Sequence, residues 1–570
     1  MLGVKIYIDS TPGKNKGDEL MKKSLALVLA LVLVLSLGLT ACGPKTVTPD
    51  PGTPVAEPKV FRLNAGSEPP NLDPQIGTDQ VSIEVDNGLL EGLVRVHDGK
   101  VQPGMAEKWE ISADGLTYTF HLRDAVWSDG VAVTAKDFQY SIIRLLNPIT
   151  ASEYAFQGHY IVNGQEFNEG KITDATQVGV KAIDDKTFEI KLKAPTSYFL
   201  PLLSFLSFLP SRQDVVELHK EAYASAPDKF VTNGPFILTD WQHDASLTLE
   251  KSATYWDKDS VKLDKVEFAI ITDSKTAVNM YEAGDFDYVA IPKDFIEKYK
   301  AEDNVTFFSD GSEFYFQFNV KGRNPEVGKF VGNANFRKAM GFAIDRQAFI
   351  DATLKNGSQP ATRYILPLLQ GVNDKFAVEY PLDFYTPTAD VAKAKELLAL
   401  ALTEIGTTAD KIPTIGFLTG DTDVSRIQAE AIQDMLVKNL GIKIEITGVQ
   451  FKQRLELMNA GDYDLVFAGW GPDYNDPMTY ADLWVTGGGH NNTNWSNPKY
   501  DELIAFAKTA TDPKARAEAM FESEKLLLEE GPIVPIYFRS SAYTMQPYVK
   551  NLVRNFIGAD RDFVYADIIK

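Results

Sequence analysis

The chain has 570 residues, more than one hydrophobic core usually supports, so its length predicts two or three domains. Apolar residues make up 44% and charged residues 24% of the sequence, a balance typical of soluble globular proteins and not of disordered or membrane-embedded chains. The formal net charge of -21 argues against nucleic acid or an anionic lipid surface as the main partner, because both would be repelled.

The N-terminal part carries an export signal. Lys22-Lys23 precede a run of mostly Leu, Val and Ala over residues 25–39, and the small pair Thr40-Ala41 follows. Such an order is typical of a secretory signal, and the run is short for a membrane span. The single cysteine, Cys42, comes next, and the sequence ending in it resembles the lipobox of bacterial lipoproteins. We expect acylated Cys42 to be the mature N-terminus; the alternative is a buried apolar cysteine.

The residues on either side of the signal have other roles. Residues 1–20 fit neither a signal nor a domain, and a natural signal would begin at Met21, so we expect Met21 to be the true start. Residues 1–42 are then the signal with an upstream segment. Prolines are frequent over residues 43–60, which predicts an extended tether between the lipid and the folded part.

Local patterns after this tether indicate an α/β protein. Residues 117–122 alternate polar and apolar side chains, as a strand buried on one face does, and Ser128-Asp129-Gly130 supplies a turn. Thr134 with Asp137 resembles a capping box. The helix predicted after it has an apolar stripe made of Phe138, Ile142, Leu145 and Leu146.

The later part of the chain predicts alternating helices and strands. Residues 442–446 alternate as a strand, 451–459 fit a helix ended by Gly461, and 465–468 form a continuous apolar strand of the kind covered on both faces. Before them lies a helix lined by Ile427, Ala431, Leu436 and Leu440. The fold class is therefore α/β, with parallel strands late in the chain.

The segment 468–477 follows that apolar strand directly. Ligands of open α/β sheets lie outside the carboxyl ends of strands, and the glycines here let the backbone approach a ligand closely. Trp470 and Tyr474 offer flat apolar walls with polar tips, and Asp473 offers a charge. The alternative is a turn with an aromatic plug, which spacing alone favours.

Motifs for catalysis are missing from the sequence. No glycine-flanked serine elbow, His-Glu-x-x-His or phosphate loop is present, and a lone cysteine excludes a thiolate zinc cluster. Ser496 and Lys499 match Ser-x-x-Lys, but we expect Pro498 to break the helical turn between them. The six histidines are scattered singly. We therefore predict no catalytic residue, no metal site and no cofactor.

Motifs in a fixed order cover nearly everything after Val60. The most recognisable run extends from Leu116 through Trp127-Ser128-Asp129-Gly130 to Phe138. The others are Asn71-Leu72-Asp73-Pro74, Leu90-Glu91-Gly92-Leu93, Ala106-Glu107-Lys108-Trp109-Glu110, Val180 to Asp185, Asn233-Gly234-Pro235-Phe236, Phe336-Arg337-Lys338-Ala339, Ile344-Asp345-Arg346 and Ile533 to Tyr537. In these motifs the chain resembles the peptide-binding proteins of bacterial ABC importers, within family 5 of the extracellular solute-binding proteins.

The resemblance implies a two-lobed periplasmic-binding-protein-like fold with an extra domain inserted in the first lobe. The lobes would close over the ligand by hinge motion at two crossovers. By this likeness residues 61–89, 213–312 and 541–570 form domain I, 90–212 the inserted domain II, and 313–540 domain III.

The resemblance also assigns roles to single residues. In the family, the aspartate of the Gly-Trp-x-x-Asp-Tyr-Asn segment holds the amino group of the peptide, and Asp473 matches it within a segment that includes Trp470, Tyr474 and Asn475. Gly469 and Gly471 match backbone positions that bind the ligand in the manner of a β-strand. Tyr154 matches a tyrosine of the opposite wall.

The chain departs from the enteric oligopeptide receptors at the other end of the ligand. Those receptors meet the terminal carboxylate with two arginines and a histidine, and the positions here are Met458, Phe467 and Ser425. Gln317 also replaces a glutamate of that group. We therefore expect a carboxyl end that reaches solvent, sits on an unaligned lysine such as Lys355, or is chemically neutral, with Phe467 and Met458 near it.

The sequence thus predicts a monomeric, non-enzymatic receptor that delivers short peptides to the permease of an ABC importer, lipid-anchored on the outer face of the cell membrane. One alternative is a receptor of the same fold for a sugar oligomer, an opine or a metal chelate. Two others are a secreted hydrolase and a surface adhesin or signalling receptor. Calorimetry separates the peptide receptor from the same-fold receptor for another solute: only the former should bind free-amine peptides and not sugars.

Replacing Cys42 by Ala tests the predicted anchor. The variant should be folded and released from the membrane fraction, because the lipid is the expected anchor and the tether separates it from the globular part. Cell fractionation measures this. A variant that stays in the membrane fraction after a salt wash contradicts the reading of residues 21–42.

Overall fold

The computed structural model describes residues 57–97 and 99–570. Within this part, Pro58–Lys570 form one compact unit, and none of the helices combines the length and apolar character that crossing a membrane requires. The predicted signal, Cys42 and most of the predicted tether lie outside the described residues. The first strand, β1 (Val60–Asn64), begins at the last residue assigned to the tether.

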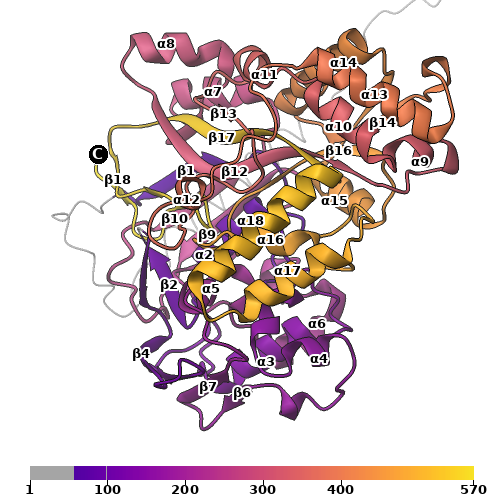
Figure 1. The fold of residues 1–570 in the computed structure, drawn as a ribbon. Coiled ribbons are helices and arrows are strands. Elements are labelled where there is room, and N and C mark those ends of the chain that lie inside the picture. The colour runs from indigo at the N-terminus through magenta and orange to yellow at the C-terminus, as the bar shows by residue number, and fades with distance from the viewer. Residues whose placement is uncertain (1–56, 98) are drawn as a thin grey trace, which may run out of the picture. The chain divides into compact units, whose positions relative to one another are not determined.

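One eleven-stranded sheet runs through both lobes (Figure 1). One group of its strands has β1 at its centre and the other has β14 (Ile415–Gly420), which pairs in parallel with both its neighbours. The path of the sheet is β15 (Ile444–Val449), β14, β16 (Leu465–Trp470), β12 (Thr306–Phe318), β17 (Ile533–Met545), β11 (Tyr288–Ala290), β1, β10 (Lys265–Ala269), β9 (Ser246–Lys251) and β8 (Phe236–Gln242), with β13 (Gln359–Pro360) paired to β17.

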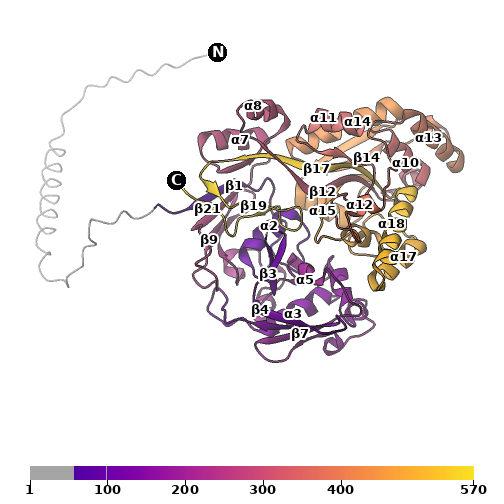
Figure 2. The same ribbon diagram turned by 60° about the vertical axis from the view of Figure 1, so that its left-hand side comes forward.

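Two long antiparallel strands, β12 and β17, connect the two groups (Figure 2). Their register shifts between Ser309 and Glu313, where Gly311 has a φ of +79°. Beside this irregularity the Arg539 guanidinium of β17 donates to the buried Asp310 carboxylate of β12 at 2.7 Å. The predicted crossovers at 312/313 and 540/541 fall on these strands, next to the irregularity.

A separate domain is inserted in the first lobe, built on the antiparallel sheet β4 (Ala106–Ile111), β5 (Thr117–Leu122), β7 (Thr187–Lys191) and β6 (Val180–Ala182). The predicted strand coincides with β5, whose residues alternate in burial. The predicted helix is α3 (Ala135–Leu146), where the Thr134 amide donates to the Asp137 carboxylate at 2.8 Å. The four residues of its predicted apolar stripe are buried. The predicted α/β, two-lobed class with an inserted domain is confirmed.

Helices cover the sheet around the late strands. The predicted 451–459 helix is α15 (Phe451–Asn459), and the one before it is α14 (Asp423–Leu440). Of the predicted stripe of α14 only Leu436 is buried; the other buried residues are Gln428, Ala429 and Ile432. The predicted strand 442–446 is β15, which begins at Ile444. We expected Pro498 to break a helical turn between Ser496 and Lys499, and this was wrong, because Pro498 is the first residue of α17 (Pro498–Thr509). Ser496 lies before that helix and therefore not one helical turn from Lys499.

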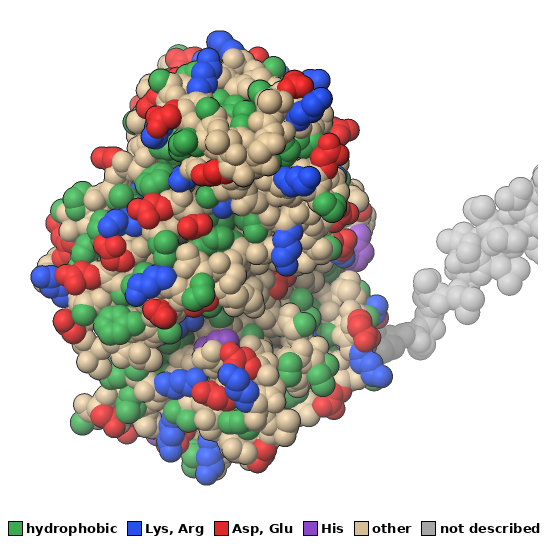
Figure 3. Space-filling model, turned by 45° about the vertical axis from the view of Figure 1, so that its right-hand side comes forward, with side chains coloured by type: hydrophobic (Ala, Val, Ile, Leu, Met, Phe, Trp, Pro, Cys, Tyr) green, Lys and Arg blue, Asp and Glu red, His purple; other side chains and the backbone are tan. Residues whose placement is uncertain are grey.

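The remaining helices and short strands surround these sheets. In the first lobe they are α2 (Gln80–Leu89), β2 (Val94–His97), β3 (Lys100–Pro103), α4 (Gly164–Asn168), α5 (Phe199–Leu202), α6 (Gln213–His219), α7 (Ser274–Ala283), α8 (Ile296–Ala301), β18 (Val549–Lys550), β19 (Val553–Arg554), β20 (Arg561–Asp562) and β21 (Asp567–Ile568). In the second they are α9 (Pro325–Val331), α10 (Ala334–Phe342), α11 (Arg346–Thr353), α12 (Phe376–Glu379), α13 (Val391–Ile405), α16 (Met478–Ala481) and α18 (Pro513–Glu530). On the face in Figure 3, acidic and basic side chains are interspersed.

Gly311→Ala tests the tight packing at the crossover. A Cβ at Gly311 would lie 2.5 Å from the Phe556 carbonyl oxygen, at a φ that disfavours L side chains. The matched control is Gly284→Ala, which has a similar φ of +85° and nothing within 4 Å of the added Cβ. We expect G311A to lower the free energy of unfolding by about 1–3 kcal/mol more than G284A, the usual cost of overpacking. Equal losses in urea unfolding would contradict this packing.

Candidate ligand-binding site

The site is built on the loop at the carboxyl end of β16. The strand is apolar and buried from Leu465 to Ala468, as expected for a strand covered on both faces. After it, Asp476 accepts a two-pronged ion pair from Arg516 at 2.8 and 2.9 Å, and the Asp473 amide donates to the Thr479 hydroxyl at 2.9 Å. These bonds fix the loop, and with it the direction of the Asp473 side chain.

The Asp473 carboxylate is buried and bonded to the inserted domain. The Tyr154 hydroxyl donates to one oxygen at 3.3 Å, and the Gln157 amide donates to the other at 2.9 Å. Gln157 is itself held by the Ser207 hydroxyl, which donates to its carbonyl at 2.6 Å. Burial raises the pKa of Asp473 well above its ordinary value, although both donors oppose the rise. No cation among the described residues pairs with this carboxylate.

A cavity of about 300 Å³ lies beside Asp473, between the two lobes. Aromatic side chains form much of its wall, and the Trp470 ring lies 5.9 Å from Tyr154 and 4.8 Å from His490. Two buried polar atoms of this wall, Trp470 Nε1 and His490 Nε2, have no hydrogen-bond partner among the described residues. Because buried polar groups are normally bonded, these atoms indicate room for a ligand.

One edge of β16 faces this cavity without a partner strand. β14 pairs with this edge only at Leu465 and Val466. The Phe467 carbonyl accepts a bond from Arg454 at 3.0 Å and therefore points away from β12, on the opposite side. Because the backbone N–H and C=O groups of successive residues point to alternate edges of a strand, those of Gly469 point to the same free edge as those of Phe467. A Cβ at Gly469 would lie 2.9 Å from the Phe314 ring, so packing against Phe314 favours glycine there.

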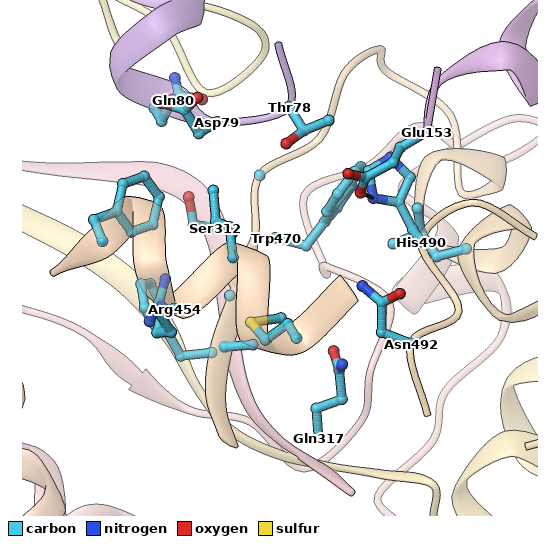
Figure 4. A pocket seen from close by; sticks show the side chains of 18 of the residues that line it. Thr78, Asp79, Gln80, Glu153, Ser312, Gln317, Arg454, Trp470, His490 and Asn492 are labelled. Atoms are coloured by element: carbon cyan, nitrogen blue, oxygen red, sulfur yellow. Dashed lines mark ion pairs between the residues drawn. The ribbon is translucent and has the colours of Figure 1, made fainter. Parts of the chain in front are cut away.

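Acidic and neutral polar side chains line the wall opposite Arg454 (Figure 4). Glu153 accepts a bond from the Asn459 amide at 2.7 Å, and its other oxygen lies 3.6 Å from His490 Nδ1. Burial raises the pKa of Glu153 to about 6 and lowers that of His490 to about 3. His490 is therefore neutral at pH 7, while Glu153 is ionised and only partly solvated.

The structure brings together six of the residues named from the sequence: Asp473, Trp470, Gly469, Gly471, Tyr154 and Gln317. It directs three others elsewhere. Tyr474 stacks on Tyr198 with ring centroids 4.8 Å apart. The Asn475 side-chain carbonyl accepts from the Gln370 backbone amide at 3.0 Å, and Asn475 lines a second cavity, which Asp473 also borders. The Phe467 ring packs among other aromatic residues, 5.8 Å from Phe314. Phe467 does not line the first cavity, and its contact with a ligand stays a prediction.

Sequence reasoning missed Arg454 and His490, which line the cavity, and Gln157, which donates to Asp473. Arg454 precedes Met458 by one helical turn, so the i, i+4 spacing could have placed it on the same face. Gln157 lies three residues after Tyr154 in a 3₁₀ turn (Ala155–Tyr160), where residues three apart face the same way. His490 gave no local signal, because its neighbours form no regular element.

Comparisons with known proteins agree with this geometry. The model of the bacterial extracellular solute-binding proteins, family 5 Middle, matches residues 100–492, and the chain belongs to this family. It is 35% identical to the dipeptide-binding protein DppE of Bacillus subtilis over 536 residues, covering 93% of this chain and 96% of the relative. The structure of Listeria monocytogenes OppA bound to peptide matches with a TM-score of 0.85 and 35% identity, covering 90% of this chain and 100% of that one.

A third relative informs the lobe arrangement. The murein tripeptide-binding protein MppA of Escherichia coli, 29% identical in the structural comparison, matches with a TM-score of 0.81, covering 91% of this chain and 100% of that one. The structure described as its unliganded open form matches with only 0.58 over the same share of this chain and 99% of its own. Together with the Tyr154 and Gln157 bonds to Asp473, this difference indicates that the described structure has its lobes closed over the cavity.

Glu153→Gln tests the burial of the acidic wall. A carboxyl group whose folded-state pKa rises from 4.5 to about 6 destabilises the fold above pH 6, and the penalty disappears as pH falls to 4.5. The variant should therefore be more stable than the wild type at pH 8 by up to about 2 kcal/mol, since one pKa unit is worth 1.36 kcal/mol. Urea unfolding at pH 8 and 4.5 measures this. A difference that is absent at pH 8 would show that Glu153 is solvated.

Proposed function

We propose that this chain captures short peptides in the cavity between its lobes and delivers them to the permease of an ABC importer. The observation that carries this proposal is the buried Asp473 carboxylate, which lacks a described cation and lies beside the free edge of β16. An ammonium group supplies the missing charge, and a peptide backbone supplies the missing strand. The names of the relatives, dipeptide-binding and oligopeptide-binding protein, support the same ligand class.

The proposed roles follow from placement. Asp473 binds the amino group of the peptide, assisted by Tyr154 and Gln157, which also hold the lobes together. Gly469 and Gly471 bind the backbone of the ligand, because neither carries a side chain of its own that would hold a peptide away from the main chain. Trp470 and Gln317 line the side-chain space, where ordered water permits broad specificity.

Closure is coupled to binding by the same charges. An empty closed cavity leaves Asp473 and Glu153 desolvated without a cation, which costs free energy and favours the open form. A bound ammonium offsets that cost, so the ligand has the differential affinity that a conformational change requires. We place the hinge where β12 and β17 cross near Gly311 and Arg539, between domain III (313–540) and the lobe formed by domain I (61–89, 213–312, 541–570) and domain II (90–212).

The location and assembly complete the proposal. The family is extracellular, so the chain acts outside the cytoplasm. We infer that acylated Cys42 anchors a monomer to the outer face of the membrane, with the proline-rich tether giving it reach.

Asp473→Asn tests the amino-group site. The change removes one partner of a buried charge pair, which costs about 3–5 kcal/mol, or about two to four powers of ten in affinity. Acetylating the amino group of the peptide should weaken wild-type binding by a comparable factor. Combining both changes should add little, because they remove the same interaction.

Isothermal titration calorimetry measures these affinities. Wild-type affinity should also fall as pH drops through the raised pKa of Asp473, because only the ionised carboxylate attracts an ammonium. Asp476→Asn is a poor control, since Asp476 holds Arg516; the exposed Asp410→Asn serves better. If neither D473N nor acetylation of the peptide changes the affinity, Asp473 has only a structural role in the turn.

A further inference from the structure

Arg454 is a cation of the cavity that lacks an anionic partner. Its Nη1 donates to the Phe467 carbonyl at 3.0 Å, and its buried Nε has no hydrogen-bond partner among the described residues. No described carboxylate lies within ion-pair distance of it, and the nearest recorded ring is Phe451, with its centroid 5.0 Å away. The other arginine of the cavity, Arg539, is paired with Asp310 and Asp560 at 2.7 and 3.0 Å. Arg454 is therefore the unneutralised arginine of this wall.

Desolvation makes this arrangement costly in the absence of a ligand. It lowers the pKa of Arg454 to about 10, which leaves the guanidinium protonated at neutral pH. A buried charge is normally paired, so an enclosed guanidinium with an unused N–H is suited to an incoming anion. The Phe467 carbonyl uses a single N–H of the five that an arginine carries, and it fixes the position of the side chain.

Arg454 and Glu153 lie at different parts of the cavity. Two other charged residues that line it are engaged elsewhere: Asp79 caps α2, and Arg539 is paired with Asp310. Figure 4 shows Arg454 on one side and Glu153 with His490 on the other. Arg454 is bonded at Phe467, near the start of the free edge of β16, whereas Asp473 follows the end of that strand. From Phe467 to Trp470, where β16 ends, three residue steps span about 10 Å, close to the length of an extended peptide of about three or four residues. The acidic and basic ends of the cavity are thus spaced for one short zwitterion.

We propose that Arg454 binds the terminal carboxylate of the peptide and makes the receptor selective for free-acid peptides of about three or four residues. This inference rests on the proposed function. It gives the carboxylate of the peptide a cationic partner, which the sequence comparison had not found. Of the three uncharged positions noted there, only Met458 lines the cavity. The Ser425 hydroxyl accepts from Thr422 at 2.8 Å, and neither Ser425 nor Lys355 lines the cavity.

The test compares matched peptides on matched variants. A panel of peptides of two to eight residues is titrated into the wild type, each as free acid and as C-terminal amide. We expect the tightest free acids to have three or four residues and to lose at least about a hundredfold on amidation, as for a buried charge pair. Arg454→Met should lose a similar factor for free acids and little for amides, and Arg454→Lys should keep part of the preference.

Arg426→Met controls for a change in net charge, because Arg426 is exposed on α14 and paired with Glu430 at 3.5 Å. The melting temperature of each unliganded variant separates binding from structure. R454M should melt no lower than the wild type, since it removes an unpaired buried charge, whereas a purely structural Arg454 would lower it.

Three outcomes overturn the inference: equal affinity of acid and amide for the wild type, equal weakening of both by R454M, or preference for peptides longer than six residues. In each of these cases the peptides still bind and still depend on Asp473, so the proposed function stands. If no peptide of the panel binds the wild type, the proposed function fails, and this inference fails with it.

Discussion

The carboxylate of Asp473 is held by a hydroxyl and an amide from the opposite lobe, and no described cation neutralises it. This arrangement is only marginally favourable without a ligand, because two neutral donors replace less of the hydration of a carboxylate than a cation does. The same contacts join the lobes, so under the proposed function the charge state of one residue would govern both binding and closure. The cavity, the free strand edge and the aromatic wall are arranged around that side chain.

Strands β12 and β17 connect the two strand groups of one continuous sheet, so each lobe can have its own part of that sheet. Their irregularity near Gly311 interrupts the ladder at the proposed crossover between the lobes, and the Asp310–Arg539 pair joins the two strands there. A regular ladder along both strands would resist bending, because many inter-strand hydrogen bonds would have to distort at the same time. Two strands with a local shift can instead absorb rotation at a few residues.

The cavity stores unfavourable electrostatics at both of its ends. Asp473 and Glu153 are desolvated acids, and Arg454 is a desolvated base, with neutral aromatic residues between them. No ion pair joins Arg454 to either acid among the described residues, so these charges do not neutralise each other by direct contact. A protein built only for stability would replace such groups by apolar residues, so their retention is consistent with a ligand that carries both charges.

The sequence by itself determined the class of fold and the local elements, because alternation and helical spacing are local properties: β5 and α15 have their predicted bounds, and α3 begins at its predicted cap. It also singled out Asp473 and Trp470, since a glycine-rich loop after an apolar strand is readable from neighbours in the chain. Tertiary structure alone decided which side chains line the cavity. Phe467 turns into an aromatic cluster, Tyr474 stacks on Tyr198, and Arg454 enters the cavity, because each direction depends on the sheet edge and on packing partners far away in sequence.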